Sequence, residues 1–179
     1  IEDFDVKTLL RPEYMKESDE SAACMAAAED RGVKVIIITS QTDIQLGSAK
    51  LVIHPADKVY ENDASNNSSL VTEVFHGNNS LLFTGDIEKE RIADIKYELN
   101  DAGYDFLKVP HHGRYEKILP EFFSLVGAQS AVITSSEKNP EEQETIQALE
   151  DAGVKDILLT RGGEITLQSD GRKLDFTQK

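Results

Sequence analysis

The chain of 179 residues has the length of one compact domain and can bury a hydrophobic core. It carries 33 acidic and 19 basic residues, a formal net charge of −14, which disfavours unaided binding to nucleic acid because such binding rests on clustered Lys and Arg. A single cysteine excludes an internal disulfide framework and a cysteine zinc cluster. No apolar run approaches the roughly 20 residues of a membrane helix, and no secretory signal is visible.

Predicted helices and strands alternate along the chain, with no low-complexity linker between them. Before residue 104 the expected elements are a strand at 5–10, a helix at 16–32, a buried strand at 33–39, short apolar pieces at 43–47 and 49–55, a hairpin at 70–86 and a helix at 87–103. The hairpin is the clearest of these, because alternating residues lead into a Gly-Asn-Asn turn and a second strand leaves it.

The second half of the chain continues the alternation and ends in a hairpin. Its expected elements are a strand at 105–109, a helix at 117–127, a strand at 130–136, a helix at 140–153, a strand at 155–160 and a hairpin at 163–177. Interleaved helices favour a layered α/β domain, and two clear hairpins argue against a purely parallel sheet. Residues 1–179 are therefore expected to form a single α/β domain with mixed sheets.

Residues able to bind a metal follow two of the predicted strands where each strand ends. Asp86 follows one strand, and His111 and His112 follow the next, where Pro110 stops the pairing and Gly113 frees the backbone. Because neighbouring strands that end at one edge of a sheet bring their tips together, Asp86 and His112 are expected to meet. Imidazole and carboxylate are usual ligands of zinc, manganese and iron, so this edge is predicted to bind metal.

Structural roles compete with these metal roles. A helix is predicted directly after Asp86, and Asp is a preferred N-cap residue. Because adjacent side chains diverge, only one of His111 and His112 is expected to bind metal, while the other contacts substrate or packs. His54 and His76 are weaker candidates, since His54 precedes a proline at a strand end and His76 is most simply a solvent-exposed residue of the hairpin turn.

Other catalytic templates are missing from the sequence. It contains no G-x-x-x-x-G-K-[ST], no G-x-G-x-x-G after a strand, no G-x-S-x-G and no H-E-x-x-H. A receiver-like or phosphatase doubly wound domain with Asp86 as nucleophile would need an acidic cluster around that residue. Glu88, the nearest candidate, should lie at the start of a helix and point away, so this interpretation is disfavoured.

Five stretches of the sequence occur in a specific order and spacing. They are "NNSSLVTEV", "LLFTGDIEKE", "FLKVPHHG", "AVITSSEKNP" and "ALEDAGVKDILLTRGGEITLQSDG". Together they resemble the metallo-β-lactamase-fold hydrolases of the ComEC type, the bacterial competence-protein domain and its stand-alone relatives. The resemblance runs from about the first strand to the end of the chain and implies a metallo-β-lactamase-like αββα sandwich with a metal site at one edge of its two sheets.

The resemblance also implies an activity and roles for individual residues. Two divalent metal ions, with zinc the first choice and manganese or iron as alternatives, would activate a water for hydrolysis of a phosphodiester or related ester. Asp86 matches the residue that bridges both metals in the family. His112 matches a metal ligand and His111 a catalytic contact to substrate or transition state, although the alternative assignment exchanges these two roles.

Further matches concern the surroundings of the site and the substrate. Asn66 and Ser69 match the family's Asn-x-x-Ser-Leu-Val stretch and are expected to support the site, whereas Arg114 replaces the serine often found after His-His-Gly. DNA degradation is a natural proposal for ComEC relatives. The acidic composition instead favours a small phosphorylated or ester substrate over nucleic acid.

The family's H-x-H-x-D-H motif, which supplies most of the metal ligands, is absent from this sequence. We therefore expect that Ile1 begins inside the domain, so that the chain is its C-terminal portion and the sandwich is N-terminally incomplete. A catalytic zinc needs about three protein ligands and an open position, whereas about two converging ligands are expected here. Weak or absent metal binding, and no turnover, are therefore predicted for these residues alone.

A second interpretation belongs to a different class of function. The chain would then be a non-catalytic α/β module or a stable proteolytic core with a structural or partner-binding role. This interpretation predicts intact sheets and an empty metal edge. Apolar residues exposed near Ile1, at the truncated edge, would also favour self-association.

Overall fold

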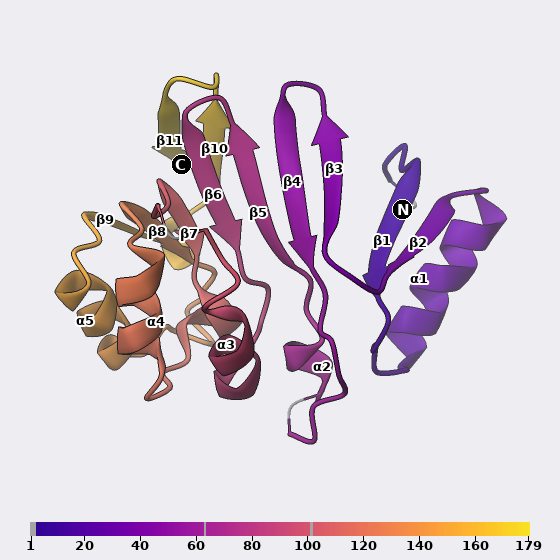
Figure 1. Ribbon diagram of the computed structural model, residues 1–179, viewed down its shortest axis with the longest axis horizontal. Helices are drawn as coiled ribbons and strands as arrows, with labels where there is room; N and C mark the ends of the chain where they lie inside the picture. Colours follow the sequence, from indigo (N-terminus) through magenta and orange to yellow (C-terminus); the bar gives the residue numbers. More distant parts are fainter. Residues whose placement is uncertain (1–2, 63, 101) are drawn as a thin grey trace.

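The computed structural model describes residues 3–62, 64–100 and 102–179 and is built around one seven-stranded sheet (Figure 1). In spatial order its strands are β3 (Thr42–Leu46), β4 (Ala49–His54), β5 (Val71–His76), β6 (Asn79–Phe83), β7 (Phe106–Lys108), β8 (Ser130–Ile133) and β9 (Asp156–Leu159). The strands from β3 to β6 form an antiparallel meander, and β7, β8 and β9 continue from β6 as parallel strands. The prediction of an α/β fold with a mixed sheet is confirmed.

Three helices connect the parallel strands and pack on one face of this sheet. They are α3 (Lys89–Ile95), α4 (Leu119–Val126) and α5 (Gln143–Asp151). Leu82, Leu107 and Ala131 occupy one register row across β6, β7 and β8, and they belong to the same buried cluster as Phe122 and Leu149 of the helices. Because side chains alternate along a strand, this row gives the sheet one continuous apolar face toward the helices.

The opposite face of the sheet is covered by the C-terminal hairpin, β10 (Ile165–Ser169) and β11 (Leu174–Gln178). Leu81, Phe106 and Val132 form the buried part of this second cluster, and the rings of Phe106 and Phe176 lie 6.1 Å apart. The hairpin predicted at 163–177 is therefore present and forms a second β layer.

The N-terminal part contains β1 (Thr8–Pro12), α1 (Asp19–Asp30) and β2 (Lys34–Ile38), with the two strands paired in parallel. Figure 1 shows this unit beside β3, at the opposite end of the molecule from α5. The strand predicted at 33–39 is present as β2, but the prediction that it is buried is wrong, since Ile37 remains 46% exposed. The reason is that β2 pairs only with β1 and stays outside the large sheet. Ile1 lies outside the described residues.

The helix predicted at 87–103 is much shorter in the structure. It begins at Lys89, and the N-cap position is the extended residue Glu88. The alternative role of Asp86 as N-cap of this helix is therefore wrong. The chain leaves the helix after Ile95, and the backbone amide of Asn100 donates to a buried carboxylate of β5. Within the described residues no helix has the length and apolar character needed to cross a membrane.

Candidate metal centre

The candidate site lies at the carboxyl ends of three neighbouring parallel strands. Asp86 follows β6, the residues 110–113 follow β7, and Thr134 follows β8. Ligands of open α/β sheets commonly bind outside the carboxyl ends of strands. The structure brings Asp86 and His112 together as the strand order predicts, with 3.3 Å between Asp86 Oδ2 and His112 Nε2.

The turn after β7 directs its two histidines to different partners. It is a short segment, Pro110–Gly113, in which His111, His112 and Gly113 have φ angles of 43°, 55° and 78°. Non-glycine residues rarely adopt this left-handed region, and strained backbone of this kind clusters at functional sites. The rings of His111 and His112 stand 6.3 Å apart and at 61° to one another, so the two imidazoles diverge as expected.

His112 is held in the tautomer that a metal ligand requires. Its Nδ1 lies 2.8 Å from the backbone carbonyl oxygen of Thr134 and 2.9 Å from the Thr134 hydroxyl. Because a carbonyl oxygen only accepts, Nδ1 carries the proton and donates, which leaves the lone pair of a neutral ring on Nε2. A backbone carbonyl behind the distal nitrogen is the usual support of a metal-binding histidine.

Asp86 is paired with a lysine as well as with His112. Lys108 Nζ lies 3.0 Å from Asp86 Oδ1 and donates to the carbonyl oxygen of Gly85 at 2.7 Å. Burial acts to raise the pKa of Asp86, but the hydrogen bond and charge of Lys108 outweigh burial and hold this pKa below its usual value. Asp86 is therefore a carboxylate at neutral pH, with one oxygen toward Lys108 and the other toward His112.

Gly85 and Ser69 set the direction of the chain at Asp86. Gly85 has a φ of 60°, and a Cβ at this position would lie 2.6 Å from Ser69 Cβ, so only glycine fits without movement. The Ser69 hydroxyl accepts a hydrogen bond from the Asp86 backbone amide at 3.2 Å. Ser69, which was expected to support the site, contacts it through this bond.

A second group of ligand atoms surrounds His111. One atom from each of Glu88, His111 and Glu116 lies within 4.8 Å of the others, a spacing that could hold a metal ion. His111 Nδ1 is 3.2 Å from Glu88 Oε1, and the Asn66 side-chain amide donates to that same oxygen at 2.7 Å. Glu116 accepts a hydrogen bond from the Lys89 backbone amide. Glu88 and Glu116 therefore place carboxylate oxygens at this edge in addition to the two converging ligands expected from the sequence.

The prediction that Glu88 points away from the site is wrong. The helix begins one residue later, and the extended backbone of Glu88 turns its side chain inward, where it is 6% exposed. Its amide is held by Asn67 Oδ1 at 2.8 Å, which fixes this conformation. Glu116 and Lys108 were also missed, because neither lies in a pattern that distinguishes a site residue from a surface charge.

His54 and His76 lie apart from this edge in hydrogen-bonded positions. His54 Nε2 is 2.8 Å from Glu73 Oε1 in the interior. The expectation that His76 is a solvent-exposed turn residue is wrong, because it is the last residue of β5 and is only partly exposed. Its ring nitrogens lie 2.9 Å from the hydroxyls of Ser48 and Ser169. The C-terminal hairpin covers this residue, which sequence spacing did not reveal.

Comparison with known proteins supports the fold. No protein-family model matches the chain. It is 26% identical over 176 residues to ComE operon protein 3 of Bacillus subtilis (strain 168), and the match covers 96% of this chain but only 22% of that protein. Among solved structures it is similar to Igni18, a metallo hydrolase from Ignicoccus hospitalis KIN4/I, with a TM-score of 0.53, 13% identity, and coverage of 97% of this chain and 81% of that one.

A second solved structure is similar over a smaller part of its length. CmlA, a diiron β-hydroxylase from Streptomyces venezuelae, matches with a TM-score of 0.52 and 12% identity, over 84% of this chain and 38% of that one. The chain therefore has a metallo-β-lactamase-like α/β fold and is similar to part of the ComEC-type ComE operon protein 3.

Proposed function

We propose that the chain belongs to a metal-dependent hydrolase of the metallo-β-lactamase superfamily that acts on a phosphodiester or related ester. The observation that carries this proposal is the approach of His112 Nε2 to Asp86 Oδ2, with the distal nitrogen of His112 bound to the Thr134 carbonyl. A histidine that only caps or packs does not need its free nitrogen turned to a carboxylate at a strand end.

The donor set fits divalent metal ions. Asp86 and His112 would hold one ion, and Glu88, His111 and Glu116 offer a neighbouring set of nitrogen and oxygen atoms. These ligand types suit zinc first, and manganese or iron as well. When bound, two such ions supply Lewis acidity, lower the pKa of water and neutralise negative charge on the substrate.

Other residues of the edge have roles that their own contacts suggest. Thr134 holds the His112 tautomer, and Ser69 positions the backbone of Asp86. The Lys108 ammonium, in contact with Asp86, would stabilise negative charge that develops on a reacting ester. His111 would contact the substrate or transition state if it is not itself a ligand, with Asn66 beside it.

A non-catalytic role is the second candidate, and one contact favours it. Lys108 satisfies Asp86 Oδ1 without any metal, and a carboxylate that bridges two ions would have to release this lysine. Because the H-x-H-x-D-H motif is absent from this sequence, we also propose that the chain lacks the metal ligands that this motif supplies. It would then supply only part of the ligand set and not turn over substrate alone.

Zinc titration of the chain by calorimetry tests the metal site. We expect weak zinc binding that falls by about tenfold to a hundredfold in His112→Ala, because loss of a direct ligand should cost at least as much affinity as loss of a group that only orients a ligand. His76→Ala is the matched control, since this histidine is held by two serines away from the edge and should leave the affinity unchanged.

The same titration distinguishes the candidates. Zinc affinity that is equal in the unmodified chain and in His112→Ala would contradict the metal role and favour the non-catalytic module. Tight binding of two ions per chain, accompanied by hydrolysis of bis(p-nitrophenyl) phosphate, would instead contradict the proposal of a partial site.

A further inference from the structure

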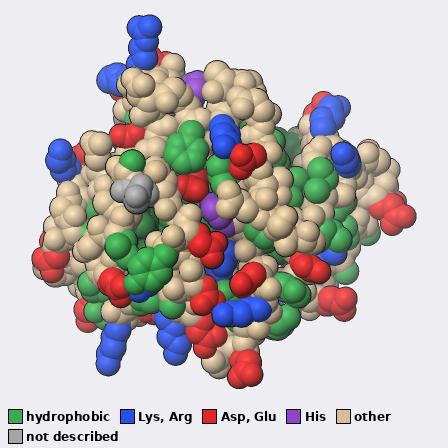
Figure 2. Space-filling model, in the orientation of Figure 1, with side chains coloured by type: hydrophobic (Ala, Val, Ile, Leu, Met, Phe, Trp, Pro, Cys, Tyr) green, Lys and Arg blue, Asp and Glu red, His purple; other side chains and the backbone are tan. Residues whose placement is uncertain are grey.

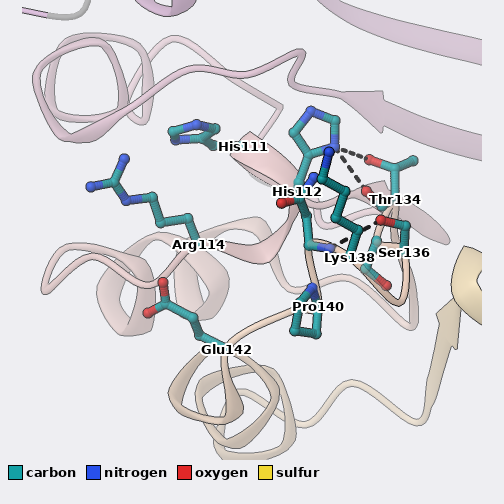
Figure 3. Close-up of a pocket in the computed structure, with 10 residues that line it drawn as sticks. His111, His112, Arg114, Thr134, Ser136, Lys138, Pro140 and Glu142 are labelled. Carbon is teal, nitrogen blue, oxygen red and sulfur yellow. Dashed lines mark hydrogen bonds between the residues drawn. The ribbon is translucent and has the colours of Figure 1, made fainter.

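A pocket of about 600 Å³ lies directly beside the two histidines, between the turn after β7 and the loop after β8 (Figure 3). Its lining includes His111, His112, Arg114, Ser135, Lys138 and Glu142. This size is typical of sites for small molecules. A substrate bound at the metal edge would extend into this pocket.

Two cations of the pocket have no partner of their own. The side chains of Arg114 and Lys138 are exposed, and neither forms a hydrogen bond or ion pair with another residue of the described ranges. Figure 3 shows the two side chains apart from one another, with Arg114 on the side of His111 and Lys138 beside His112. Acidic side chains are scattered over the face drawn in Figure 2, and the whole chain carries a net charge of −14, so two unpaired cations at one pocket locally oppose that charge.

The wall between these cations carries hydroxyl groups on a well-defined loop. Ser135 is only 8% exposed, and its buried Oγ has no hydrogen-bond partner among the described residues. A buried hydroxyl without a partner costs free energy, which a ligand oxygen would recover. The loop is braced, because the Ser136 amide donates to the Asn139 carbonyl at 3.0 Å and the Asn139 amide donates to Ser136 Oγ at 3.1 Å.

We propose that this pocket binds a phosphate group of the substrate that is separate from the ester cleaved at the metal edge. Arg114 would bind it through its planar guanidinium, Lys138 as a point charge, and Ser135 through its hydroxyl. The assignment rests on the proposed function for the position of the cleaved ester. It narrows the substrate to a small molecule with a second phosphate. The Glu142 carboxylate also lines the pocket and would repel a bound phosphate. Its removal should therefore raise phosphate affinity, whereas removal of either cation should lower it.

Titration of the ¹⁵N-labelled chain with inorganic phosphate, in buffer containing EDTA, tests the pocket without any metal. We expect amide shifts confined to residues 111–114 and 134–139, with binding weakened about tenfold by Arg114→Ala or Lys138→Ala, as for loss of one charge-assisted hydrogen bond. Glu142→Gln should tighten binding. Lys155→Ala is the matched control. This exposed lysine lies just before the amino end of β9, away from the carboxyl ends of the strands, so its loss should leave phosphate affinity unchanged.

The outcomes separate this inference from the metal proposal. Shifts spread over the surface, or equal phosphate affinity in the unmodified chain and in both cation variants, would overturn it. Acetate binding as strong as phosphate binding would also overturn the assignment of a phosphate. If phosphate binds as expected while zinc affinity is equal in the unmodified chain and in His112→Ala, the pocket stands and the hydrolase proposal fails.

Discussion

Replacing Glu73 with alanine is expected to lower the free energy of unfolding by about 3 to 5 kcal/mol, the cost of removing one partner from a buried charged network. Glu73 is 4% exposed and joins His54 to Tyr104, whose hydroxyl donates to its second oxygen. The Asn100 backbone amide donates to that oxygen as well. Alanine would leave these groups buried without partners. Urea unfolding monitored by circular dichroism gives the measurement.

Tyr104→Phe is the matched control for this network. It removes one hydroxyl but leaves Glu73 bound to His54 and Asn100, so a smaller loss of about 1 to 2 kcal/mol is expected. If Glu73→Ala unfolds no more easily than Tyr104→Phe, the network does not stabilise the fold in the way its contacts imply.

The pH dependence of the Glu73 effect has a definite sign. Burial acts to raise the pKa of Glu73, but its hydrogen bonds to His54, Tyr104 and Asn100 outweigh burial and lower this pKa in the folded state. The carboxylate therefore contributes stability above the pKa of an unfolded glutamate, about 4.3, and this contribution is lost as the pH falls through the lower folded value. The difference between the unmodified chain and Glu73→Ala should accordingly shrink in acid.

Gly113→Ala is expected to cost about 2 to 4 kcal/mol, the sum of a left-handed backbone and an overpacked contact. Its φ is 78°, and a Cβ would lie 2.7 Å from Ile133 Cγ2 and 3.1 Å from Glu141 Cβ. Both neighbours are buried, so neither can move away freely. The turn that carries His111 and His112 must then shift, which thermal or urea unfolding would detect together with changed histidine NMR signals.

Gly153→Ala separates the two contributions. Gly153 has a φ of 88°, but a Cβ added there would meet no described atom within 4 Å, so only the backbone cost of about 1 to 2 kcal/mol is expected. Equal destabilisation by the two substitutions would show that the contact with Ile133 does not restrict the turn.

The position of the site was predictable because it depends on where strands end. The apolar runs that stop at Asp86 and at His111-His112 form neighbouring parallel strands. The sequence pattern alone was therefore sufficient to predict that Asp86 and His112 lie close together. The two hairpins were predictable for a similar reason, since alternating residues around a turn define both partners of a pair.

The composition of the site was less predictable because it depends on tertiary contacts. Glu88 faces inward because its backbone amide donates a hydrogen bond to the side chain of Asn67, more than twenty residues earlier in the sequence. The helix begins only after Glu88, at Lys89. Lys108 is a strand residue whose partner, Asp86, is set only by the register of β6 and β7. The burial of β2 was overestimated because its apolar composition does not reveal how many strands pair with it.

In the turn after β7, the two histidines that could bind a ligand have a backbone conformation that lowers the stability of the fold. His111 and His112 both occupy left-handed conformations that glycine adopts at much lower cost. Selection for stability alone would therefore favour glycine at either position, at the expense of an imidazole facing Asp86 or Glu88. Within a set of evolving variants, the most thermostable sequences should be those in which glycine replaces one or both of these histidines.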